Sequence, residues 1–146
     1  MLFLCIVAGT ANAAAEIRRV PSPLSVAKTT DALEAAVEDA GATVFARVDH
    51  AAGAKKAGFE LDPSQLLIFG NPKLGTPAMI DNAVAGLYLP LKVLVYRTTD
   101  GQVYLAYEDP TLALTQLDGV QEGATYLAKM TGALAKLTAK AAGVSP

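Results

Sequence analysis

The sequence contains no tryptophan, one cysteine and one histidine in 146 residues. The cysteine, Cys5, lies in an N-terminal stretch that we interpret below as a secretory leader, so the mature chain would carry no thiol. Disulfides, cysteine nucleophiles and thiolate metal sites would then be excluded. The lone histidine, His50, argues against zinc, because protein zinc sites normally use three or four side chains.

The chain also lacks a strong charge of either sign. Twelve Lys and Arg residues oppose 14 Asp and Glu residues, which gives a net charge of −2, and the charges are scattered. No basic field therefore forms that would hold a phosphate backbone, and we predict no nucleic-acid partner. No apolar run approaches the roughly 20 residues of a membrane-spanning helix, so we predict no membrane span.

The first residues, MLFLCIVAGTANAAAE, have an apolar core at 2–8 followed by small residues that end in Ala11-Asn12-Ala13. This order is typical of a secretory signal. We predict a leader over 1–13, with cleavage after Ala15 as the alternative, and a periplasmic or secreted location. No positive charge precedes the apolar run, and a buried N-terminal strand is the other interpretation. The remaining residues, 14–146, are enough for one domain with a real core.

The hydrophobic pattern predicts alternating strands and helices. We expect strands over 17–20, 43–49, 66–69, 91–97 and 102–107, and helices over 25–40, 51–57, 76–86 and 123–142. Asp100-Gly101 is a strong hairpin signal between the last two strands. Within 43–49 we expect Val44, Ala46 and Val48 on the buried face. This mixture with an antiparallel hairpin indicates an α+β layer.

Asp49 and His50 stand together where the second strand ends. One interpretation is a general base, or one ligand of a hard metal ion that could also recruit Glu108. The other, which we favour, is a pair that closes a turn and caps the following helix.

A second candidate is the stretch Phe69-Gly70-Asn71-Pro72-Lys73. Glycine could adopt a positive φ there, Asn71 could bond backbone, Pro72 could stop the strand, and Lys73 could add charge to an anion cradle. Phosphate-binding motifs need several glycines at fixed spacing, which this stretch lacks. We therefore favour a simple turn, and we place the next helix start at Thr76-Pro77.

The segments TVFARVDHAAGAKKAGFELDPSQLLIFGNPKLGTPAM, LPLKVLVY and GQVYLAYEDP resemble a bacterial family known as domain of unknown function 302. The resemblance runs from about residue 16 to residue 114, and the joint occurrence of DHAAGA, FGNPK and LPLK carries it. It implies an α+β fold with one curved, mostly antiparallel sheet of about five strands, the main helices on one face, and association in pairs. It implies no activity or cofactor, and it draws attention to Asp49, His50 and 69–72.

These observations lead to an expectation of an exported, non-catalytic module that binds a small ligand or a protein partner. The site would lie near a common corner formed by Asp49, His50, Phe69, Gly70, Asn71, Pro72 and Lys73. An enzyme with His50 as general base, and a carrier of a hard metal ion, are the alternatives. We expect no cofactor.

Overall fold

The computed structural model describes residues 16–145, so the predicted leader and its cleavage site lie outside the described part. Five strands are present: β1 (Ile17–Ser22), β2 (Thr43–Asp49), β3 (Ser64–Gly70), β4 (Leu91–Arg97) and β5 (Val103–Glu108). The helices are α1 (Val26–Asp39), α2 (His50–Lys56), α3 (Pro72–Asp81), the 3-10 helix η1 (Ala83–Leu87), α4 (Pro110–Leu114) and α5 (Thr125–Ala142). Within 16–145, no helix combines the length and the apolar character needed to cross a bilayer.

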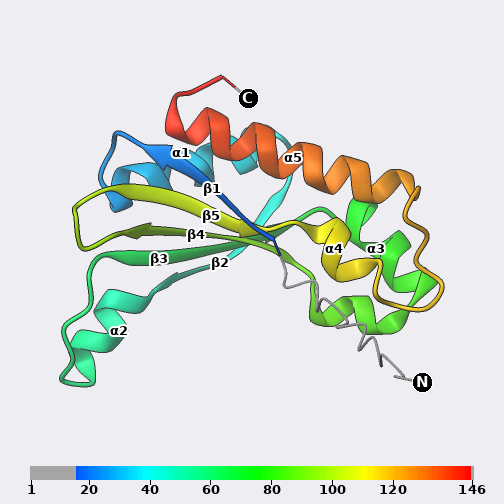
Figure 1. The fold of residues 1–146 in the computed structure, drawn as a ribbon, viewed down its shortest axis with the longest axis horizontal. Helices are drawn as coiled ribbons and strands as arrows, with labels where there is room; N and C mark the ends of the chain where they lie inside the picture. The colour runs from blue at the N-terminus through cyan, green and yellow to red at the C-terminus, as the bar shows by residue number, and fades with distance from the viewer. Residues whose placement is uncertain (1–15, 146) are drawn as a thin grey trace, which may run out of the picture.

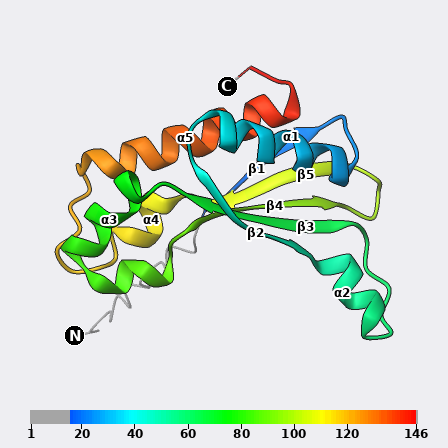
Figure 2. The same ribbon diagram turned by 180° about the vertical axis from the view of Figure 1, so that it is seen from behind.

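The strands form one sheet in the order β1-β5-β4-β3-β2, and every neighbouring pair is antiparallel. Helices α1 and α5 pack against each other and cover one face of this sheet (Figure 1). Helices α3 and α4 and η1 gather at one end of the sheet, whereas α2 projects at the other end (Figure 2). The predicted α+β architecture, a five-stranded antiparallel sheet with helices packed against it, is confirmed.

The core lies between the sheet and the two long helices. Val93 and Val95 face the helices and are fully buried, as strand alternation requires. In α5, the apolar side chains of Leu127, Met130 and Leu134 are each 1% exposed. Met130 and Leu127 belong to a second apolar cluster that joins α5 to α3, η1 and α4.

The predicted buried face of the second strand is right at Val44 but wrong at Ala46 and Val48, which are exposed. A bulge between Val44 and Ala46 shifts the register, so Val44 pairs with Phe69 while Ala46 pairs with Ile68. Val44 therefore shares the helix-covered side of the sheet, and Ala46 the opposite side. The extra residue is Phe45, whose side chain is left 55% exposed.

Two helix starts differ from the sequence prediction for one physical reason. Helix α3 begins at Pro72, not at Thr76-Pro77, because the side chain of Asn71 caps it and proline fits its first position. Helix α4 was not predicted, although Asp109 and Pro110 use the same device. Pro77 is accommodated inside α3.

Candidate functional site

The structure separates the predicted site residues into two groups. Asp49 is the last residue of β2 and His50 follows it, while Asn71 follows β3, but these neighbouring strands run in opposite directions. Asp49 pairs with Gln65, five residues before Gly70, so the two groups lie about 17 Å apart along the strands. The expectation of one common corner is therefore wrong.

The interpretation of Asp49 as a helix cap is confirmed. One carboxylate oxygen accepts a hydrogen bond from the backbone N–H of Ala52 at 2.8 Å, and the other accepts one from Nε2 of Gln65 at 3.1 Å. These bonds, the one from Ala52 foremost, lower the pKa of Asp49. His50 is the exposed first residue of α2, and its side chain makes no hydrogen bond within residues 16–145. Within residues 16–145, no side chain is therefore hydrogen-bonded to His50 to orient it as a general base.

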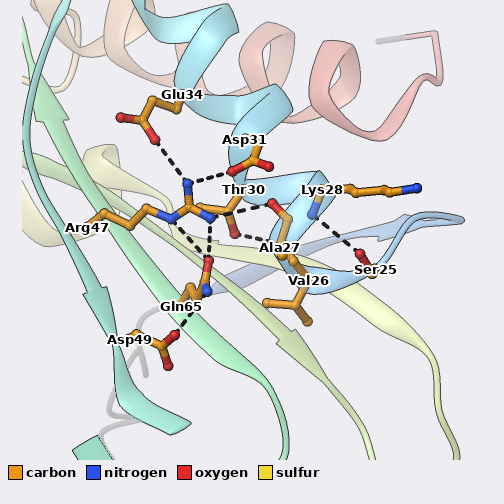
Figure 3. A network of polar contacts seen from close by, with 10 residues as sticks. All are labelled: Ser25, Val26, Ala27, Lys28, Thr30, Asp31, Glu34, Arg47, Asp49 and Gln65. Atoms are coloured by element: carbon orange, nitrogen blue, oxygen red, sulfur yellow. Dashed lines mark hydrogen bonds and ion pairs between the residues drawn. The ribbon is translucent and has the colours of Figure 1, made fainter. Parts of the chain in front are cut away.

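An arginine network ties this edge of the sheet to α1 (Figure 3). The guanidinium of Arg47 donates to Asp31 at 2.6 Å, to Glu34 at 3.2 Å and to Gln65 at 2.8 Å. Burial alone would lower the pKa of Arg47, but the two carboxylates outweigh it and raise the pKa. Because Gln65 also donates to Asp49, the network holds the exposed strand β2 and the start of α2 in place.

A second cavity of about 460 Å³, with a mixed polar and apolar wall, lies beside this network, between the start of α1, α2 and the start of β3. Its charged wall residues are Asp49, Lys55 and Glu60. Both signs of charge are present, and Asp49 is already engaged by Ala52 and Gln65. The wall therefore shows no preference for one class of ligand.

The predicted carboxylates for a hard metal ion also lie apart. Asp49 is on β2 and Glu108 on β5, and β3 and β4 separate them, which places them at least about 14 Å apart. The described chain contains no group of three or more His, Cys, Asp and Glu side chains that could hold a metal ion.

At the other end of β3, the corner at Asn71 is a capped turn, as favoured from the sequence. The Oδ1 atom of Asn71 accepts a hydrogen bond from the backbone N–H of Lys73 at 2.9 Å. Gly70 does not adopt the positive φ that glycine could have taken there. The backbone at Gly70 is closely approached: a Cβ there would lie 3.5 Å from Cβ of Pro90 and 3.3 Å from Cε2 of Phe45, so the ring of Phe45 would have to shift by a few tenths of an ångström. Phe69 points into the core and is 2% exposed, and Lys73 is exposed.

This corner forms the rim of an apolar cavity of about 390 Å³. Strands β2, β3 and β4, helices α3 and α5, and the loop before β4 all contribute to its wall. The lining residues are Phe45, Gly70, Asn71, Pro72, Leu74, Gly75, Thr76, Met79, Leu89, Pro90, Leu91 and Met130. Within the described chain this wall contains no titratable side chain, and its polar side chains are one amide and one hydroxyl.

The side chains that make this cavity come from distant parts of the sequence. Phe45 reaches it because of the bulge in β2, and Met130 closes it from α5. A hydrogen bond holds α3 against α5 nearby: the hydroxyl of Tyr126 donates to Oδ2 of Asp81 at 2.6 Å. The motif at 69–73 signalled one rim of the cavity, but no local pattern signalled Phe45 or Met130.

Comparison with known proteins identifies the family to which the chain belongs. The family described as Domain of unknown function DUF302 matches residues 18–137. The chain belongs to the DUF302 family. The match extends further toward the C-terminus than the resemblance recognised over 16–114.

The chain is similar to one solved structure and to two named bacterial proteins. A crystal structure of an uncharacterized conserved DUF302 protein from Bacillus stearothermophilus has a TM-score of 0.76 and 20% identity, and the match covers 86% of this chain and 97% of that one. At this identity the likeness shows the fold alone. Over 114 residues, the chain is 42% identical to proteins named Fluoride-specific ion channel FluC 1 from Brucella suis biovar 1 (strain 1330) and Brucella abortus biovar 1 (strain 9-941). The aligned residues make up 77% of this DUF302 chain but only 45% and 42% of those two proteins.

Proposed function

We propose that this DUF302 protein binds a small, uncharged, apolar molecule in the cavity at the Gly70–Pro72 corner and performs no chemistry on it. The composition of the wall carries the proposal. Ligand sites are typically concave, largely apolar and roughly 300–1,000 Å³ in volume, with a few polar groups that orient the ligand. The cavity has a volume of about 390 Å³, and Asn71 and Thr76 supply its polar side chains.

The same wall argues against catalysis at this position. General acid–base chemistry needs a titratable group within hydrogen-bond reach of the reacting atom. The lining residues of the described cavity offer no such group, and His50 is not among them. An ionic ligand is also disfavoured, because no side chain of opposite charge would compensate its lost hydration.

Substitution of Gly75 tests the proposal. Gly75 lies in α3, and a Cβ there would be 3.5 Å from Cδ1 of Leu89, inside the cavity. Gly75→Leu should fill the cavity without loss of the helix, because leucine favours helices over glycine. Gly53→Leu is the matched control, since Gly53 also lies within a helix and a Cβ there would meet nothing within 4 Å.

The probe is N-phenyl-1-naphthylamine, an uncharged apolar fluorophore that brightens in apolar surroundings. We expect saturable binding to the wild-type chain and to Gly53→Leu, and at least tenfold weaker binding to Gly75→Leu. Phe45→Ala should also weaken binding of the probe. We expect this variant to fold, because Phe45 is 55% exposed and contributes little to the core. No binding to the wild-type chain, or equal binding to all variants, would contradict the proposal.

Two further features complete the proposal. We infer that the protein is exported, because residues 1–13 have the pattern of a leader. The mass of the N-terminal peptide of the protein from its native host would test whether the leader is removed.

We also infer association in pairs, which is supported by the edge position of β2, because an edge strand presents unpaired backbone groups. Sedimentation equilibrium should then give twice the monomer mass, and a monomer at all concentrations would refute pairing.

The channel activity in the names of the Brucella relatives is not part of the proposal. The matched region is less than half of those proteins. A site for an apolar ligand is instead argued from this chain's own residues.

A further inference from the structure

Two polar side chains stand in the otherwise apolar wall of the cavity, and both belong to the start of α3. Asn71 is the cap residue that precedes the helix, and Thr76 lies in its second turn. An apolar wall cannot satisfy a polar group of a ligand, which then loses its bonds to water without replacement. The hydrogen bonds that Asn71 and Thr76 leave open therefore indicate which polar group a ligand can carry.

The side-chain amide of Asn71 is engaged on one side only. Its Oδ1 atom accepts a hydrogen bond from the backbone N–H of Lys73 at 2.9 Å, and this bond identifies the other atom of the amide, Nδ2, as the donor. Nδ2 makes no hydrogen bond within residues 16–145. Because an NH2 group has two donor hydrogens and accepts nothing, Asn71 offers the cavity a free donor.

Asn82 shows that a capping asparagine need not leave its donor free. Its Oδ1 atom accepts a hydrogen bond from the backbone N–H of Val84 at 2.9 Å, as Oδ1 of Asn71 does from Lys73. However, Nδ2 of Asn82 donates to the backbone carbonyl of Asp118 at 3.0 Å. Of these two caps, the one at the cavity is the one whose donor has no partner in the described chain.

The hydroxyl of Thr76 is also free within residues 16–145. The helical threonines Thr30 and Thr138 each donate to the backbone carbonyl four residues earlier at 2.8 Å, whereas Thr76 makes no such bond. No buried side-chain nitrogen or oxygen in the described chain lacks a partner. The free atoms of Asn71 and Thr76 are therefore open to solvent, and a ligand in the cavity can reach them.

We propose that the ligand of the cavity carries a carbonyl group on an uncharged, apolar body, as in a ketone, an ester or a lactone. This inference rests on the proposed apolar-ligand site and names the polar group that the site accepts. A carbonyl oxygen has two lone pairs and no hydrogen, so it can accept from both Asn71 and Thr76 and brings no donor that needs a partner. A carboxylate also accepts hydrogen bonds, but the described wall holds no side chain of opposite charge to compensate its lost hydration.

Three naphthalenes of nearly equal shape separate the carbonyl from the apolar body. 2-Acetylnaphthalene carries the carbonyl, 2-isopropylnaphthalene has a methyl group in place of the oxygen, and 1-(2-naphthyl)ethanol has a hydroxyl. Their affinities for the full chain are measured by displacement of N-phenyl-1-naphthylamine. The readout is the ratio of the ketone affinity to the hydrocarbon affinity, because a change in the shape of the cavity affects both compounds alike.

Two variants remove the donors without removing the helix start. Asn71→Asp keeps the oxygen that caps α3, because aspartate caps helices as well as asparagine does, and Thr76→Val replaces the hydroxyl by a methyl group. We expect Thr76→Val to lower the ratio about two- to tenfold, the range for one hydrogen bond. Asn71→Asp should lower it further, because its carboxylate repels the oxygen of the ketone. Thr125→Val is the matched control, since Thr125 is an exposed helical threonine outside the cavity wall, and it should leave the ratio unchanged.

The possible outcomes distinguish this inference from the proposed function. An equal ratio in wild type, Asn71→Asp and Thr76→Val would overturn the carbonyl inference, although displacement by the hydrocarbon would still support an apolar site. An alcohol that binds wild type as tightly as the ketone does would also overturn it. If N-phenyl-1-naphthylamine does not bind, or if none of the three compounds displaces it, the proposed cavity function is refuted and the carbonyl inference with it.

Discussion

Tyr126→Phe should loosen the cavity, because it removes one hydroxyl that joins two of its walls. That hydroxyl donates to Asp81 at 2.6 Å and so links the end of α3 to the start of α5. A hydrogen bond to a charged group contributes about 1.5–3 kcal/mol to the free energy of unfolding. Asp81 is exposed and regains water in the variant, so we expect the loss to lie near the lower end, about 1.5 kcal/mol.

Urea unfolding at pH 7 measures this loss as a lower midpoint with an unchanged slope. Tyr88→Phe is the control, because Tyr88 is 38% exposed and the structure shows no hydrogen bond from its hydroxyl among residues 16–145. We also expect Tyr126→Phe to weaken binding of N-phenyl-1-naphthylamine. A loss below about 0.5 kcal/mol, well under the usual range for such a bond, would refute the reasoning.

The same pair predicts a dependence on high pH. Burial, together with the hydrogen bond and negative charge of Asp81, raises the pKa of Tyr126 from 10.0 to about 12. The folded chain therefore holds this proton more tightly than the unfolded chain, so the stabilisation is complete below pH 10 and is lost as the pH rises toward 12. Since phenylalanine does not ionise, the stability difference between wild type and Tyr126→Phe should shrink over this interval; a constant difference from pH 8 to pH 12 would contradict the assignment.

Three other substitutions have expected outcomes. Gly75→Ala should raise the free energy of unfolding by about 0.5–1 kcal/mol, because its Cβ would be at an ordinary contact distance of 3.5 Å from Leu89; a lower thermal midpoint would show that the cavity wall cannot accept a methyl group. Asp49→Ala should lower the thermal midpoint at neutral pH by removing the bonds to Ala52 and Gln65. Since the pKa of Asp49 is lowered in the folded chain, the difference from wild type should fade as the pH falls below 3.8, and persistence at lower pH would refute the role of the carboxylate. His50→Ala should change neither stability nor probe binding, as His50 is exposed and outside the cavity wall; a clear effect on the probe would revive the general-base alternative.

The sheet was predictable because its signals are local. Asp100-Gly101 fixes the β4–β5 hairpin, and Gly101 has the positive φ of 91° that this turn requires. Strand alternation also places Val93 and Val95 on one face and Lys92 and Leu94 on the other, and the structure buries the two valines. The bulge at Phe45 was not predictable, because the residues on both sides of it still alternate in the sequence.

The position of the site was harder to predict because it depends on topology. Asp49 ends one strand and Asn71 directly follows another, and they would lie together if the strands were parallel. Helix α2 instead joins two antiparallel neighbours, so the residues after β2 and after β3 lie at opposite ends of the sheet. The cap residues could have been read from the sequence, since Asn71-Pro72 and Asp109-Pro110 share the pattern of a capping side chain followed by proline.

The most direct test of the central claim uses the methionines. The chain contains three, and two of them, Met79 and Met130, line the cavity. In NMR spectra of protein labelled with ¹³C at the methionine methyl groups, N-phenyl-1-naphthylamine should move both the Met79 and Met130 signals, and Gly75→Leu should suppress the change. Saturable binding of the probe with no movement of either signal would place the ligand elsewhere and contradict the account.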